Sequence, residues 1–277
     1  LGLPFVGVGF IYPQGYFRQR IPADGWQEAV YDTLNFDQVP IHPVFDAQGN
    51  RLILQVALRG TPVHVQVWQL RIGRVNAYLM DANVPQNAAW DRDLTARLYG
   101  GDQETRIRQE MVLGLGGVRL LRALDIQPSA WHMNEGHSAF LAVERCRMLI
   151  KEHGLTFDQA AELTKAGALF TTHTNVPAGI DRFPADLIGR YFGHYYEKLG
   201  LNHEQFLALG RQNPHDPYEP FCMAILAFRM AAYANGVPLW EGTLRDELHE
   251  HYQQHTGVPI NSPDTPRSIF ERHTRID

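Results

Sequence analysis

The most constraining feature of this sequence is the alternation of helical and strand-like patterns between residues 103 and 175. Apolar residues recur at three- and four-residue steps up to Leu124, which indicates a helix. Short apolar segments at 129–133 and 168–172 indicate strands, and a helical pattern at 138–154 lies between them. Strands that alternate with helices form βαβ units. The sequence therefore predicts an α/β fold with a parallel sheet.

Three glycines, Gly114, Gly116 and Gly117, fall within the predicted helix that ends at Leu124. Each lowers the intrinsic helix propensity by up to about 1 kcal/mol. Glycines on one side of a helix usually mark close packing against a sheet or another helix. We therefore expect this helix to pack closely against its neighbours.

Residues 1–80 carry strand patterns instead. The segments 51–58 and 63–70 each alternate apolar with polar residues, and Arg59-Gly60-Thr61-Pro62 is a turn signal between them. This pattern predicts an antiparallel hairpin. A third strand is predicted at 75–81. The polar segment 16–26 is predicted to be a loop.

Two further segments have simple interpretations. Residues 82–102 are rich in Asn, Pro, Asp and Gly, and they are predicted to form an irregular loop in which Asp91-Arg92-Asp93 is solvated. Residues 183–200 and 221–234 have helical patterns and are joined by a loop rich in Pro, His and Asn.

Composition excludes several functions. The 277 residues are 44% hydrophobic, enough to bury the core of one large or two modest domains. A net charge of −5 gives no electrostatic surface for nucleic acid. The chain has neither a long apolar run nor a basic start, so we expect a soluble, cytoplasmic protein that does not bind membranes. Cys146 and Cys222 have no CxxC spacing and are expected to be core thiols in a reducing compartment.

Two polar clusters carry the functional signal. The first, WHMNEGHSAF, begins at Trp131, and the second, FTTHTNVP, begins at Phe170. Each follows a predicted strand of the same sheet. Ligands of open α/β sheets bind at the carboxyl ends of the strands. The two clusters therefore predict one shared site for a small molecule or a sugar.

A metal site is the alternative interpretation of His132, Glu135 and His137. Their spacing, H-x-x-E-x-H, has one residue more than the inverted zinc motif. On a helix, His132 and His137 would point about 140° apart and could not share a face. Glu135 also suits the N-terminus of the following helix, where a carboxylate is favoured. We therefore predict no metal ligands here.

The remaining candidates are less specific. His173 follows an apolar strand, and a lone histidine is more often a core residue than a ligand. Its neighbours Thr172, Thr174 and Asn175 nevertheless favour a polar pocket. The Gly100-Gly101-Asp102 turn precedes a helix, where it can hold an anion or a sugar hydroxyl, although the same motif is an ordinary turn.

Long motifs in this chain resemble the α-glucan phosphorylases, the family of glycogen, starch and maltodextrin phosphorylases, and in particular their short microbial type. The resemblance extends from residue 2 to about residue 237 and covers the N-terminal half of the family's fold. It rests on these segments: GVGFIYPQGYFRQRI, YLMDANVPQN, LYGGDQETRIRQEMVLGLGGVRLLRAL, WHMNEGHSAFLAVER, LFTTHTNVPAGIDRFP and AILAFRMAAYANGV.

The resemblance implies a partial N-terminal Rossmann-like domain of a GT-B glycosyltransferase, with a β-rich antiparallel portion at residues 1–80. The implied reaction is phosphorolysis of a terminal α-1,4-linked glucose to glucose 1-phosphate. His173 matches the family histidine that binds the glucose at the cleavage subsite and is expected to be catalytic. The residues expected to bind substrate are Asp102, Glu135, His137 and Thr174.

The family cofactor, pyridoxal phosphate, forms a Schiff base with a lysine of the C-terminal half, and its phosphate assists acid/base chemistry. The three lysines of this chain, Lys151, Lys165 and Lys198, lie in predicted amphipathic helices and not in the pocket-like setting that a Schiff base requires. We therefore expect no cofactor-binding residue here. The implied partners are an α-1,4-glucan, inorganic phosphate and a missing C-terminal domain, and a homodimer of the full enzyme is left open.

The ends of the chain suggest a fragment. The sequence opens on Leu1, and Asn235-Gly236-Val237 runs straight to Pro238 and Trp240, whereas the family has further residues between two such NGV segments. We therefore expect a partial glucan-binding domain at 1–237 and a polar tail at 238–277 after an internal deletion. Such a fragment is expected to be inactive alone. The alternative functions are a non-catalytic carbohydrate-binding or structural fragment and a metal-dependent hydrolase.

Overall fold

The computed structural model describes residues 2–98, 101–173 and 179–236. The chain divides into two compact units, Leu1–Gln127 and Pro128–Asp277. Both units combine helices with strands, and parallel and antiparallel pairing both occur, which confirms the α/β class. The predicted tail at 238–277 lies outside the described residues. No helix in the described ranges is long and apolar enough to cross a membrane.

The first unit is built on a five-stranded sheet. Its strands follow the order β1-β7-β6-β4, and β5 also pairs with β6. Strand β6 is antiparallel to β4, β5 and β7. The strand bounds are β1 Val6–Phe10, β4 Ile41–Pro43, β5 Ile53–Leu58, β6 Thr61–Ile72 and β7 Val75–Asp81.

The predicted hairpin is confirmed as β5 and β6, with a tighter turn than expected. Arg59 and Gly60 have φ values of 54° and 83°. Positive φ at both central residues is the requirement of a two-residue type I′ turn. Thr61 and Pro62 therefore belong to β6. The alternation is confirmed in β5 and in the first half of β6, where every second residue from Leu54 to Leu58 and from Val63 to Val67 is buried.

The antiparallel prediction for residues 1–80 is wrong for β1, which pairs with β7 in parallel, Val6 opposite Asn76. A parallel pair needs a crossover connection of a dozen or more residues. The chain between Phe10 and Val75 passes through five other strands and is long enough to return in the same direction. The antiparallel hairpins formed by strands that follow one another in the sequence do not determine the direction in which β1 pairs with β7.

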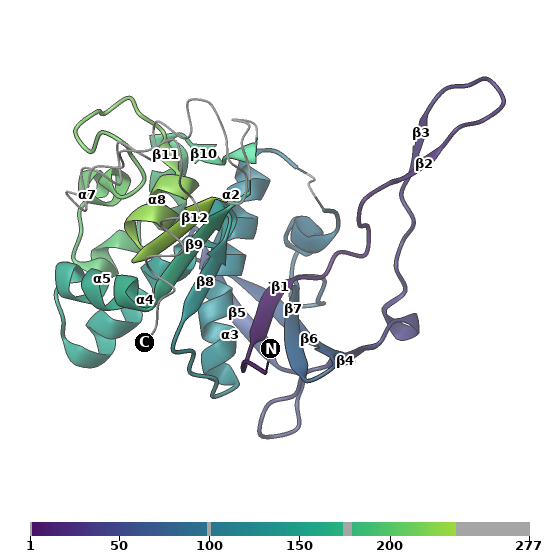
Figure 1. Cartoon of the computed structure of the whole chain (residues 1–277), viewed down its shortest axis with the longest axis horizontal. Coiled ribbons are helices and arrows are strands. Elements are labelled where there is room, and N and C mark those ends of the chain that lie inside the picture. Colours follow the sequence, from purple (N-terminus) through teal and green to yellow (C-terminus); the bar gives the residue numbers. More distant parts are fainter. Residues whose placement is uncertain (1, 99–100, 174–178, 237–277) are drawn as a thin grey trace. The chain divides into compact units, whose positions relative to one another are not determined.

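The predicted loop at 16–26 is also wrong in part. Strand β2 (Arg18–Arg20) pairs antiparallel with β3 (Glu28–Val30), and this hairpin projects from the sheet of the first unit (Figure 1). The side chains at its tip are exposed, and Trp26 is 78% exposed. Because neither strand buries a face, the sequence lacks the apolar alternation that would have predicted them.

The predicted helix before Leu124 is confirmed as three consecutive helical segments: α2 (Gln103–Met111), a π-helical turn η3 (Val112–Gly116) and α3 (Gly117–Ala123). Its close packing is confirmed too. A Cβ on Gly116 would lie 3.3 Å from Val56 Cγ2, and one on Gly117 would lie 3.3 Å from Val8 Cγ1. The glycines thus let the helix approach the sheet. Preceding it are two short elements of the predicted irregular loop: α1 (Ala89–Arg92) and η2 (Asp93–Thr95).

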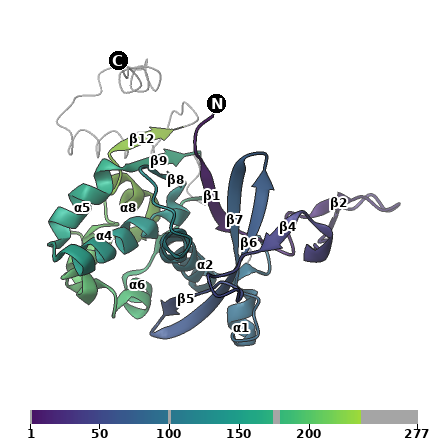
Figure 2. The same cartoon turned by 90° about the horizontal axis from the view of Figure 1, so that it is seen from below.

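The second unit contains a parallel sheet of three strands in the order β12-β9-β8. The predicted strands at 129–133 and 168–172 are β8 (Trp131–Asn134) and β9 (Ala168–Thr172), and their parallel pairing is confirmed. Helices α5 and α8 both contact β9 (Figure 2). The helical elements are η4 Gly136–Ser138, α4 Phe140–His153, α5 Phe157–Ala166, α6 Ala185–Phe192, η6 Tyr196–Leu199, α7 His203–Ala208 and α8 Met223–Arg229.

The predicted helix at 221–234 is wrong at both ends. Its first residues form β11 (Phe221–Cys222), which pairs with β10 (Arg182–Phe183), and its last residues begin β12 (Tyr233–Gly236). Helix α8 occupies only the middle. The Ala232 N–H donates to the carbonyl of Ala168, so pairing with the β9 edge replaces the helical bonds that the sequence favours.

Four phenylalanines form the aromatic centre of the second unit. Phe140, Phe192, Phe206 and Phe221 are completely buried. The ring centroids of Phe140 and Phe192 are 4.5 Å apart, and those of Phe192 and Phe206 are 4.9 Å apart. These rings join α4, α6, α7 and β11 into one core. Helix α7, which the sequence analysis assigned to a loop, contributes Phe206 and begins with a capping box formed by Asn202 and Gln205.

A substitution at Gly136 tests how closely the strand-to-helix turn approaches α8. A Cβ on Gly136 would lie 2.9 Å from the backbone nitrogen of Ala224. Overpacking of this kind lowers stability by about 1–3 kcal/mol. We expect Gly136→Ala to lower the urea midpoint of the 277-residue chain, whereas Gly15→Ala, whose Cβ would meet nothing within 4 Å, should leave it unchanged or slightly raise it. Equal midpoints for Gly136→Ala and the wild type would contradict the close approach.

Candidate functional site

The two predicted polar clusters meet in the second unit, at the carboxyl ends of parallel strands. Asn134, the last residue of β8, pairs with Thr171 of β9, and Thr171 pairs with Asn235 of β12. The carboxyl ends of the three strands therefore lie at one edge of the sheet. His173 follows β9 directly and Glu135 follows β8 directly. This is the edge at which ligands bind in open α/β sheets.

Glu135 joins the two clusters through its carboxylate. Its Oε1 accepts a hydrogen bond from the backbone N–H of His173, and its Oε2 accepts one from the Thr172 hydroxyl at 3.2 Å. Glu135 lies at the N-terminus of the next helix as predicted, because it is the N-cap residue of η4, but its side chain makes no capping bond. The carboxylate instead fixes the start of the segment that follows β9.

The backbone of Glu135 is strained. Its φ of 64° and ψ of 170° lie in a region that is essentially restricted to glycine. Such a conformation costs about 1–3 kcal/mol and persists where the surroundings enforce it. Here the Glu135 N–H donates to the Thr171 carbonyl at 2.8 Å, and Gly136 packs against the start of α8. The strained backbone therefore belongs to the turn in which Glu135 bonds to Thr171 and His173 at the end of β9.

The ring of His173 is held by β8. Its Nε2 lies 2.9 Å from Oδ1 of Asn134, and the side chain is otherwise exposed. An asparagine oxygen only accepts, so Nε2 carries the proton of this bond, and Nδ1 takes no part in it. His173 thus has the polar surroundings that its threonine neighbours suggested. Thr174 lies outside the described residues.

His132 also takes part in this edge of the sheet, although its predicted role was only that of a disfavoured metal ligand. Its Nε2 lies 2.7 Å from Oγ1 of Thr171, and the Thr171 hydroxyl donates to Oδ1 of Asn235 at 2.5 Å. Partial burial lowers the pKa of His132, and the nearby His173 lowers it further. Both effects favour the neutral imidazole. Asn235 is a site residue that the sequence analysis missed, because it followed a predicted helix.

His137 lies in η4 and is partly buried. Among the described residues, no group of three or more His, Cys, Asp or Glu side chains is arranged to hold a metal ion. The edge of the sheet thus offers imidazole, carboxylate, amide and hydroxyl groups. This combination suits a ligand with many hydroxyl groups, which both donate and accept hydrogen bonds.

Asp102 belongs to the first unit and acts as the N-cap of α2. Its Oδ1 accepts bonds from the backbone N–H of Thr105 at 2.8 Å and from the Thr105 hydroxyl at 2.9 Å. The bond from the Thr105 backbone is the main reason why the pKa of Asp102 is lowered, and the Thr105 hydroxyl lowers it further. The Asp102 side chain is therefore engaged in capping its own helix, and Gly100 of the predicted turn lies outside the described residues.

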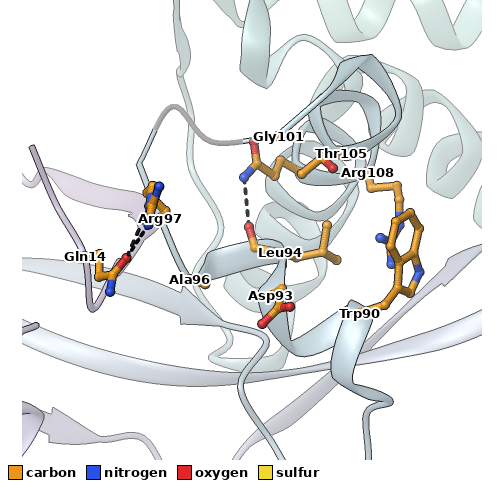
Figure 3. A pocket seen from close by; sticks show the side chains of 10 residues that line it. Gln14, Trp90, Asp93, Leu94, Ala96, Arg97, Gly101, Thr105 and Arg108 are labelled. Carbon is orange, nitrogen blue, oxygen red and sulfur yellow. Dashed lines mark hydrogen bonds between the residues drawn. The ribbon is translucent and has the colours of Figure 1, made fainter. Parts of the chain in front are cut away.

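The first unit also contains a groove of about 520 Å³ that the sequence did not indicate (Figure 3). Its polar groups bind one another: Arg97 donates to Gln14 at 3.1 Å, and Arg108 lies over the Trp90 ring and pairs with Asp91. Asp91, predicted to be solvated, is thus the partner of an arginine that is 3% exposed. The remaining lining residues are Asp93, Leu94, Ala96, Gly101, Thr105 and Gln109.

The cap formed by Asp102 gives a testable pH dependence. Replacing an N-cap by alanine lowers stability by about 0.5–2 kcal/mol, whereas asparagine caps nearly as well as aspartate. We expect Asp102→Ala to lower the urea midpoint of the chain and Asp102→Asn to preserve most of it. Because the folded-state pKa is depressed, the contribution of the carboxylate is present above the unfolded pKa and is lost as the pH falls through the folded value.

Urea midpoints measured at pH 7 and near pH 3 would check this expectation. The difference between wild type and Asp102→Asn should shrink at the lower pH. A difference that grows on acidification would contradict the cap.

Comparison with known proteins identifies the relatives of this chain. Residues 121–236 match the family described as Phosphorylase, carbohydrate phosphorylase. The chain is 43% identical over 254 residues to a glycogen phosphorylase of Mycobacterium tuberculosis, 37% over 261 residues to a maltodextrin phosphorylase of Thermococcus litoralis and 39% over 237 residues to a glycogen phosphorylase of Aquifex aeolicus. These matches cover 87%, 94% and 86% of this chain but only 29%, 30% and 34% of the relatives. The chain belongs to the carbohydrate phosphorylase family, and it spans about a third of the length of the relatives it matches.

Proposed function

We propose that this chain is the sugar-binding part of an α-1,4-glucan phosphorylase, which transfers a terminal glucose from the glucan to inorganic phosphate and releases glucose 1-phosphate. The relatives are named glycogen and maltodextrin phosphorylases, which supports this reaction. The observation that carries the proposal is the cluster of imidazole, carboxylate and amide groups at the carboxyl ends of β8, β9 and β12.

The proposal extends to the domain. Residues 1–237 would be a partial N-terminal, Rossmann-like domain of a GT-B enzyme, with residues 238–277 as a separate tail. Support comes from the parallel sheet of the second unit, which has its polar residues at the strand ends. The remaining part of such an enzyme would be a C-terminal domain, and its assembly as a homodimer would involve the full-length protein.

Within this proposal, His173 is the catalytic residue. With Nε2 bound to Asn134, its Nδ1 is left to bind a glucose hydroxyl at the bond that is cleaved. Glu135 holds the His173 backbone and would restrict where the sugar can bind. His137, Thr174 and Asp102 are proposed to contribute further sugar contacts. At the carboxyl ends of β8 and β9, Glu135 and His173 would orient the glucose.

We propose that none of the three lysines of this chain binds pyridoxal phosphate, the cofactor that the family resemblance implies. Lys151 and Lys198 are exposed, and Lys165 pairs with Glu162 at 3.3 Å. A lysine that forms a Schiff base is activated in a desolvated pocket or next to another cation. The cofactor would therefore bind to another part of the full-length protein. For this reason we propose that the chain alone binds glucan without turning it over.

Two measurements test the proposed function. The full-length protein that carries this chain should release glucose 1-phosphate from maltodextrin in the presence of phosphate and should show pyridoxal absorbance. The 277-residue chain alone should show neither property, but it should bind maltodextrin in calorimetric titrations. A full-length protein that is stable and loaded with its chromophore, yet releases no glucose 1-phosphate, would refute the proposal.

Replacing His173 separates a catalytic role from a structural one. Loss of a hydrogen bond to the reacting sugar leaves a polar group unpaired, which costs about 1–3 kcal/mol, so His173→Ala in the full-length protein should lower kcat about ten- to a hundredfold. The melting temperature should change little, because the side chain is exposed at a strand end. Melting and phosphorolysis should be measured on the same preparation. A lowered melting temperature with normal turnover per folded molecule would exclude the catalytic role.

A further inference from the structure

Three side chains from three neighbouring strands form one hydrogen-bonded chain at the edge of the parallel sheet. His132 extends from β8 to Thr171 of β9 at 2.7 Å, and Thr171 extends to Asn235 of β12 at 2.5 Å. We call these residues the strand-end relay. Thr171, at its centre, is 5% exposed. The relay therefore connects β8 with the edge strand β12 through a buried hydroxyl.

The relay has a defined polarity. A hydroxyl group has only one proton, and the Thr171 hydroxyl donates it to the Asn235 oxygen. Thr171 must then accept from His132, so Nε2 of His132 carries a proton. The amide of Asn235 is also oriented, because its oxygen is already bound and only its NH2 group remains to donate. The proton on Nε2 of His132 is thus coupled, through the Thr171 hydroxyl, to the orientation of the Asn235 side-chain amide.

The relay lies on the same face of the sheet as His173. Residues two apart on a strand share a face, so His132 accompanies Asn134 on β8, and Thr171 accompanies His173 at the end of β9. Both cross-strand contacts also have the same geometry. His132 pairs with Leu169 in the register but bonds to Thr171, and Asn134 pairs with Thr171 but bonds to His173. The contact between His132 and Thr171 therefore lies two residues before the contact between Asn134 and His173, on the same face of the sheet.

Strand β12 needs such a connection. It has four residues, and within the described part of the chain it pairs only with β9. Short edge strands gain little from their own backbone bonds, and their ends fray. The bond from Thr171 to Asn235 fixes the end of β12 next to the end of β9.

We propose that His132 is a positioning residue of this site: through Thr171 it orients the amide of Asn235 and holds the end of β12 beside His173. The catalytic consequence rests on the proposed phosphorylase function. The polarity of the relay and its effect on His173 are structural and do not depend on that function.

Kinetics of the full-length protein test the catalytic consequence. Thr171→Val removes the hydroxyl and preserves the shape, and His132→Phe removes the donor; each should lower kcat about tenfold, the effect of one misplaced hydrogen bond. The KM for phosphate should be unchanged, and the variants should remain folded at the assay temperature. Thr171→Ser and His132→Gln, which retain the hydroxyl and a donor, should restore most of the rate. The matched control is His153→Phe at the end of α4, which should not change the rate.

A double-mutant cycle provides a second criterion. Because both residues act through one chain of bonds, Thr171→Val combined with His132→Phe should be no slower than either single variant. Combining Thr171→Val with His153→Phe should give the product of the separate effects. Multiplicative losses for His132 and Thr171, or a rate loss explained by a lower folded fraction, would overturn the positioning role.

Nuclear magnetic resonance of the 277-residue chain tests the relay without any turnover. Long-range proton–nitrogen spectra should show His132 as the Nε2–H tautomer. Thr171→Val should shift the ring signals of both His132 and His173, and Thr171→Ser should return them. The proposal would be overturned by a His132 ring that carries its proton on Nδ1 instead of Nε2. It would also be overturned if the His173 signals were unchanged in Thr171→Val. If the full-length wild type releases no glucose 1-phosphate, the proposed function fails, whereas these spectra still decide the relay.

Discussion

The site depends most on the two hydrogen bonds that the carboxylate of Glu135 accepts. The carboxylate accepts from the His173 backbone and from the Thr172 hydroxyl, so it connects the turn after β8 with the segment after β9. The connection requires the parallel pairing of β8 with β9 in its observed register. A slip of one residue would turn every side chain of a strand to the opposite face and separate the two clusters. Sheet register and site geometry are therefore one constraint.

The energetic arrangement around Glu135 follows from this constraint. The residue adopts a backbone conformation that disfavours every side chain, and the next residue must be glycine because the start of α8 lies against it. The aromatic core formed by Phe140, Phe192 and Phe221 supports the elements on either side. A well-packed core can maintain local strain of a few kcal/mol at a functional turn. Stability in the core is thus used to preserve geometry at the edge.

The sequence predicted the parallel pair and the two polar clusters because both depend on local patterns. Apolar segments at 129–133 and 168–172 determine the strands, and the polar residues follow them directly. The sequence did not predict β12, because Tyr233 and Ala234 continue a helical pattern and form a strand only by pairing with β9. The hairpin β2–β3 was missed for a related reason: its residues bury no face, so they carry no periodic signal. Contacts between distant segments determine both elements.

The position of β12 in the chain has a consequence for biosynthesis. The site contains residues from Trp131 onward, but its third strand ends only at Gly236. Domains fold as the chain emerges from the ribosome, at about 5–20 residues per second. Until the last strand has left the exit tunnel, the open edge of β9 has unpaired backbone groups that could bind a strand of another nascent chain. The order of synthesis thus leaves the edge of β9 unpaired until β12 has been made.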